Sequence, residues 1–69
     1  MTKYIISSGT SVVSELLEMK QSTAVKVTNE ADKAISFNTI GEAMLNASKV
    51  NKILGTHGYQ AMPIEVNKN

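Results

Sequence analysis

The stretch Phe37-Asn38-Thr39-Ile40-Gly41-Glu42-Ala43 decides how this chain folds, because it carries the signals that start a helix. Thr39 is a favourable N-cap residue, since its hydroxyl can accept a hydrogen bond from an amide of the first helical turn. Glu42, three residues later, can reach back to the Thr39 amide and complete a capping box. The sequence therefore predicts a helix that begins at Ile40.

This helix is expected to cover about residues 40–54. Gly55 can adopt the left-handed backbone conformation that ends many helices. Leu45 and Ile53 lie off the apolar stripe of the helix, so either another element covers them or they belong to a partner surface. The stripe itself consists of Ile40, Ala43, Met44, Ala47, Val50 and Leu54.

Two short strands are expected before the helix, at residues 3–7 and 24–28, where β-branched or aromatic residues are followed by turn-forming residues. Residues 11–20 fit either a helical stripe or a strand, and we favour a strand over 11–17 because a Ser-Gly-Thr turn precedes it. Residues 29–37 are either the returning arm of a hairpin or a helical turn, and the sequence does not decide between them.

A last strand is expected over residues 59–66, with Met62, Ile64 and Val66 on one side. Pro63 has no amide proton, so this strand lies at a sheet edge or its position 63 faces away from the neighbouring strand. The sequence predicts a single α+β domain over residues 1–69. Its fold is a small antiparallel β-sheet of three to four strands packed by one α-helix, in the order β-β-β-α-β.

Size and composition exclude several classes of protein. The chain has 69 residues, no cysteine and only three aromatic rings, so it must rely on aliphatic packing or on a second copy of itself. All seven cationic side chains are lysines interleaved with acids, which disfavours nucleic-acid binding. The sequence lacks a long apolar run and a signal-peptide pattern, so we expect no membrane partner and a cytoplasmic location.

The sequence also offers little chemistry. His57 is the only histidine and has no identifiable catalytic partner. No serine lies in a nucleophile elbow and no glycine belongs to a phosphate-binding loop. Soft ligands are nearly missing, and the segment 29–32 has too few donors for a calcium loop. We therefore expect no catalytic residues, no metal site and no cofactor, and hence a protein that is not an enzyme.

Several short segments together resemble small uncharacterised phage and prophage proteins of Gram-positive bacteria. The resemblance spans most of the sequence and brings no shared catalytic residues. It implies an accessory protein made in the cytoplasm of a bacterial host cell, where it would bind a host or phage protein. The segments are Lys3-Tyr4-Ile5-Ile6 with Ser8-Gly9, Asp32-Lys33-Ala34-Ile35-Ser36-Phe37, Thr39 with Glu42-Ala43, and Gly58-Tyr59 with Ile64-Glu65-Val66.

Two hypotheses for function remain. The first is a protein-interaction module that binds an unknown protein, or a second copy of itself as a homodimer, through an open face or edge of its sheet. Its predicted partner surface is Leu16, Leu45, Ile53 and Tyr59. The alternative is a weak nucleic-acid-binding accessory factor that stacks bases on a tyrosine. That factor would use Lys26, Lys33, Lys49 and Lys52 with Tyr4 or Tyr59.

Overall fold

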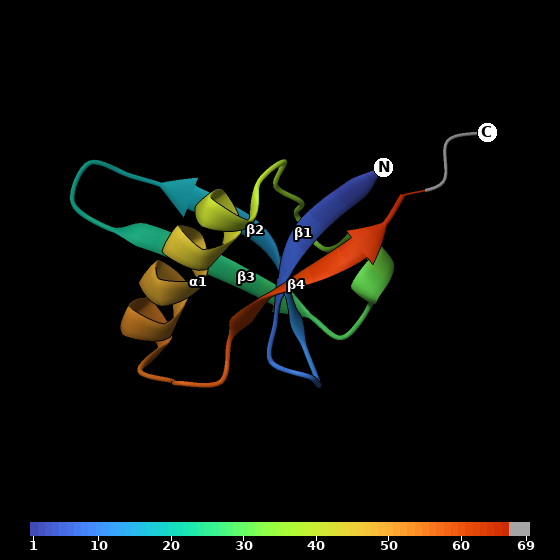
Figure 1. Cartoon of the computed structure of the whole chain (residues 1–69). Helices are drawn as coiled ribbons and strands as arrows, with labels where there is room; N and C mark the ends of the chain where they lie inside the picture. The colour runs from blue at the N-terminus through green and yellow to red at the C-terminus, as the bar shows by residue number, and fades with distance from the viewer. Residues whose placement is uncertain (67–69) are drawn as a thin grey trace.

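The computed structural model, which describes residues 1–66, is a four-stranded antiparallel sheet with one helix against one face (Figure 1). The strand order in the sheet is β3-β2-β1-β4. The predicted α+β fold is confirmed, including the strand favoured over residues 11–17. The elements in sequence order are β1 (Thr2–Ser7), β2 (Val12–Glu18), β3 (Thr23–Thr28), the 3₁₀ turn η1 (Ala31–Lys33), α1 (Ile40–Leu54) and β4 (Gln60–Glu65).

The sheet consists of two hairpin-like ribbons that are joined over only a short length. β1 pairs with β4 from end to end, and β2 pairs with β3 around a β-bulge near Ser14. β1 and β2 are paired only at Ser7 and Val12, next to their connecting turn. Beyond this point the two ribbons diverge, and Figure 1 shows them running to opposite sides of the molecule.

Residues 35–37 connect the two ribbons where β1 and β2 diverge. Phe37 exchanges two backbone hydrogen bonds with Tyr4 of β1, at 2.7 and 3.0 Å, and the Ile35 amide donates to the Val13 carbonyl of β2 at 2.9 Å. Residues 29–37 therefore combine parts of the two alternatives left open by the sequence. A helical turn does form, but it is η1 and precedes the extended part, which pairs with β1 rather than with β3.

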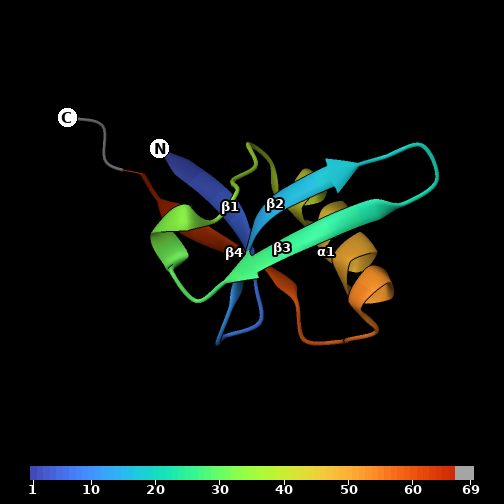
Figure 2. The same ribbon diagram turned by 180° about the vertical axis from the view of Figure 1, so that it is seen from behind.

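The hydrophobic core lies between the sheet and α1. The face of the sheet away from α1 also buries Ile5 and Val12, which alternate with core residues along their strands. Figure 2 shows η1 on that second face. The buried cluster under the helix is Ile6, Val13, Ala47, Val50 and Tyr59, with Leu16, Val25, Ile35 and Phe37 packed against it.

The helix begins and ends where the sequence predicts. The Thr39 hydroxyl accepts a hydrogen bond from the Glu42 amide at 3.2 Å, and Gly55 ends the helix with a φ of 68°. The second bond of the capping box differs from the prediction. The Glu42 carboxylate accepts from the Thr39 hydroxyl at 3.2 Å, not from the Thr39 amide.

The apolar stripe of the helix is only partly buried. Ala43, Ala47 and Val50 are buried, whereas Leu54 is exposed, and the exposed fractions of Ile40 and Met44 are 51% and 59%. The spacing of apolar residues shows which side of a helix is apolar, but not how wide the surface beneath it is. Here the sheet covers only the middle of the stripe.

Replacing the N-cap hydroxyl should weaken the fold. We expect Thr39→Ala to lower the free energy of unfolding by about 0.5–2 kcal/mol, because the Glu42 amide loses its acceptor. Thr39→Ser keeps that acceptor and should stay close to the wild type. Urea denaturation followed by circular dichroism measures both variants, and an unchanged midpoint for Thr39→Ala would contradict this account of the helix start.

Candidate functional site

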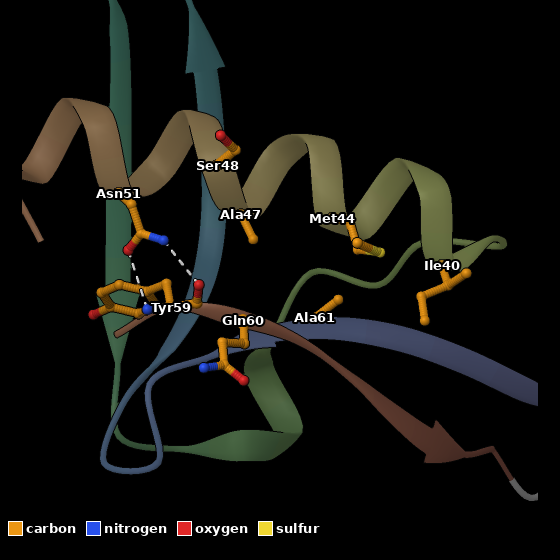
Figure 3. Close-up of a pocket in the computed structure, with 8 residues that line it drawn as sticks. All are labelled: Ile40, Met44, Ala47, Ser48, Asn51, Tyr59, Gln60 and Ala61. Atoms are coloured by element: carbon orange, nitrogen blue, oxygen red, sulfur yellow. Dashed lines mark hydrogen bonds between the residues drawn. The ribbon is translucent and has the colours of Figure 1, made fainter. Parts of the chain in front are cut away.

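The candidate site is an apolar groove between α1 and β4 (Figure 3). Its volume is about 440 Å³. Ile40 and Met44 point from the first two turns of the helix toward β4, and Gln60 and Ala61 form the opposite wall. The groove is lined by Ile40, Met44, Ala47, Ser48, Asn51, Tyr59, Gln60 and Ala61.

The side chain of Asn51 closes one end of the groove. Its Nδ2 donates to the Tyr59 carbonyl at 2.9 Å, and its Oδ1 accepts from the Tyr59 amide at 3.0 Å (Figure 3). The same Oδ1 accepts from the Thr56 hydroxyl at 3.0 Å. One carboxamide therefore makes with Tyr59 the pair of hydrogen bonds that a neighbouring strand would make.

The register of β1 and β4 shows which backbone groups of β4 point outward. Val66 donates its amide to the carbonyl of Met1, directly opposite, at 2.9 Å, so hydrogen-bonded and non-bonded pairs alternate from this point along the ribbon. The pair of Tyr4 and Pro63 is a non-bonded one. This agrees with the hydrogen bonds of Tyr4, whose amide and carbonyl both pair with Phe37 on the other side of β1.

Ala61, Pro63 and Glu65 thus direct their backbone groups away from β1. β4 is an edge strand, so these groups form the outer edge of the sheet. The prediction for Pro63 is confirmed, since it lies on an edge strand at a position that needs no amide proton. Ala61, two residues after the Asn51-bound Tyr59, is the next residue with outward-pointing backbone groups, and it lines the groove.

The structure does not bring the four residues of the predicted partner surface together. Tyr59 is 9% exposed in the core, where its hydroxyl hydrogen-bonds the Ser11 hydroxyl at 2.7 Å, and Leu16 is half-buried against the same core. Leu45 is 68% exposed and Ile53 is 41% exposed. These two point in different directions, because eight residues correspond to about 80° around a helix.

Among the residues that line the groove, sequence reasoning named only Tyr59 as a site residue. It missed Asn51 and Ala61, and it also missed Ile40 and Met44. Ile40 and Met44 belong to the apolar stripe, so the pattern did not separate them from Ala43 and Ala47, which are buried. Only one signal distinguishes them: they lie on one edge of the stripe, one turn apart, at the start of the helix. That signal is too weak to identify a surface without the position of β4.

The lysines of the nucleic-acid hypothesis are spread over three elements. Lys33 pairs with Glu30 at 3.0 Å, and Lys49 pairs with Glu18 at 3.3 Å. Of the two candidate stacking residues, Tyr59 is buried and Tyr4 is half-buried. A phosphate backbone needs a clustered cationic surface, which this arrangement does not provide. The lysines are Lys26 on β3, Lys33 in η1, and Lys49 and Lys52 on α1.

Residues 1–66 contain no helix that is long and apolar enough to cross a membrane. Nor do these residues include a cluster of three or more histidine, cysteine, aspartate or glutamate side chains that could hold a metal ion. Comparisons of the sequence and the structure with protein-family models, with curated proteins and with solved structures found no match. The resemblance to phage and prophage proteins therefore stays a prediction.

Removing the Asn51 carboxamide should destabilise the protein. We expect Asn51→Ala to lower the free energy of unfolding by about 1–3 kcal/mol, because the partly buried Tyr59 backbone groups lose their partners. Asn46→Ala is the matched control, since Asn46 bonds only the Glu42 carbonyl of its own helix. It should be neutral or slightly stabilising because alanine favours helix. Equal unfolding midpoints for the two variants would contradict the role assigned to Asn51.

Proposed function

We propose that this protein is a non-catalytic protein-interaction module and that it binds its partner at the groove between α1 and β4. One observation supports this proposal above the others. At Ala61 the apolar groove lies directly beside backbone groups that point outward from β4. Another polypeptide can fill the groove with an apolar side chain and at the same time form hydrogen bonds with the outward-pointing backbone groups.

The exposure of the helix surface above the groove supports the same proposal. Ile40 and Met44 are 51% and 59% exposed and lie next to each other on the groove. Clustered apolar side chains at the rim of a hollow are typical of interaction sites, whereas single ones are ordinary surface. Leu45 is more exposed than Met44, but it points away from the hollow and adds nothing to it.

The resemblance to phage and prophage proteins supplies the cellular context of the proposal. The protein would act as an accessory factor in the cytoplasm of a bacterial host cell, on a host protein, on a phage protein or on a second copy of itself. The dispersed lysines and the buried Tyr59 give the nucleic-acid alternative no support comparable to the groove.

Charge substitutions on adjacent helix residues test this proposal. Immobilised wild-type protein should retain a protein from bacterial lysate, and that protein, once purified, should bind the wild type with a saturable isotherm. Met44→Lys should reduce binding by about tenfold or more, because it places a charge at the apolar rim. Leu45→Lys should bind like the wild type.

Two controls decide between the remaining outcomes. Size-exclusion chromatography with light scattering shows whether the captured partner is a second copy of the same protein. Titration with mixed DNA and RNA at two salt concentrations tests for polyanion binding. Retention of nucleic acid alone, or no saturable protein binding at all, would contradict the proposed function.

A further inference from the structure

We propose that the partner supplies an extended apolar segment that adds a strand to the outer edge of β4 beneath Ile40 and Met44. This inference rests on the proposed function and names the kind of ligand that the groove accepts. It also predicts an acidic group at the end of the segment that lies beside Lys52. Backbone pairing, side-chain alternation and charge support the three parts of the proposal separately.

Backbone pairing indicates that the ligand is extended. The Asn51 carboxamide already makes a strand-like pair with the amide and carbonyl of Tyr59, at 3.0 and 2.9 Å. Ala61 is the next residue whose backbone groups face outward. A strand placed against β4 would therefore continue, at Ala61, a line of hydrogen bonds that Asn51 begins.

Side-chain alternation indicates that the segment is apolar. Ala61 is directly opposite Ile6, which belongs to the core beneath α1, so Ala61 faces the helix side of the sheet. A ligand residue directly opposite Ala61 must face the same side. Its side chain would enter the hollow and contact Met44 and Ile40, so an aliphatic or aromatic residue fits this position.

Charge around the groove indicates the acidic group. Within residues 1–66, no carboxylate lines the groove, and Ser48 and Asn51 also line an adjoining hollow. The ionisable residues that line the adjoining hollow are Lys52 and His57, and neither side chain can carry a negative charge. An aspartate, a glutamate or a terminal carboxylate at this end of the segment would meet a complementary charge.

Pro63 limits how far the added strand can pair. It faces outward two residues beyond Ala61, and it offers a carbonyl but no amide. The ladder therefore has one complete hydrogen-bonded position beside the groove, at Ala61, before Pro63 interrupts it. The next complete position, Glu65, lies beyond Pro63 and does not line the groove. We infer that a short segment is bound and that the side chain in the hollow gives much of the affinity and selectivity.

Proline substitutions on the two edges of the sheet test the backbone part. The probes are synthetic peptides selected against the wild type from a displayed library of random short sequences. Ala61→Pro removes one outward-facing amide and should weaken binding by about tenfold. Thr23→Pro removes an outward-facing amide on the opposite edge, at β3, and should leave the affinity unchanged.

Two further pairs of variants test the side-chain and charge parts. Met44→Lys should weaken binding of the selected peptide and Leu45→Lys should not. Lys52→Glu should weaken binding of peptides that carry an acidic end, whereas Lys20→Glu, in the turn between β2 and β3, should not. Circular dichroism confirms that each variant is folded. Selected peptides should share an apolar residue followed or preceded by an acidic group.

Amide hydrogen exchange on the wild type gives a readout that needs no variant. The Ala61 amide should exchange more slowly when the selected peptide is bound, because it becomes hydrogen-bonded. Three results would each overturn the inference. They are an unchanged exchange rate of the Ala61 amide, an equal loss of peptide affinity in Met44→Lys and Leu45→Lys, and failure to select any peptide. If the purified partner protein still binds wild type but not Met44→Lys while Ala61 exchange is unchanged, the proposed function stands and only the added strand is wrong.

Discussion

The hydrogen bonds made by Asn51 hold the end of the helix, the following turn and the start of β4 in one arrangement. Its backbone carbonyl accepts from the amides of Gly55 and Thr56, and its side chain binds both backbone groups of Tyr59. The helix terminus and the last strand are therefore fixed relative to each other by one residue. Because the strand leaves this point beside the helix, the groove is a consequence of the connection.

This connection also explains why part of the apolar helix face stays exposed. With its C-terminal end tied to Tyr59, α1 lies along the start of β4, and Figure 3 shows the strand diverging from the first turns of the helix. Ile40 and Met44 extend over the space that opens. Full burial of such a side chain is worth about 1.5–3 kcal/mol, so a ligand that covers them recovers stabilisation that the isolated domain lacks.

Features set by neighbouring residues could be predicted from the sequence. The bounds of α1, its Thr39 cap, its Gly55 terminus and the strand pattern depend on propensities and spacing over a few residues. Features set by distant residues could not. The pairing of Phe37 with Tyr4 joins positions far apart in the sequence, and nothing in residues 29–37 alone identifies that partner.

In the candidate site, too, features set by a single residue could be predicted from the sequence, and features set by distant residues could not. The sequence predicted that Pro63 lies on an edge strand or at a position facing away from the neighbouring strand, because proline lacks an amide proton in any surroundings. It placed Tyr59 on a partner surface and Met44 on the apolar stripe of the helix, whereas Tyr59 is buried and Met44 is exposed. Both residue types occur in either environment, so the position of the helix across the sheet decides between them, and that position depends on Asn51.

The two edges of the sheet differ in how selectively each could pair with an added strand. On β3, the pairing of Met19 with Ser22 places the backbone groups of Thr23 and Val25 outward, with no proline to interrupt them. Such an edge can pair with any strand, including one from a second copy. At β4, Pro63 limits backbone pairing, and the helix lies over one face of the strand. An added strand can therefore contact both β4 and the helix only if one of its side chains also fits the groove.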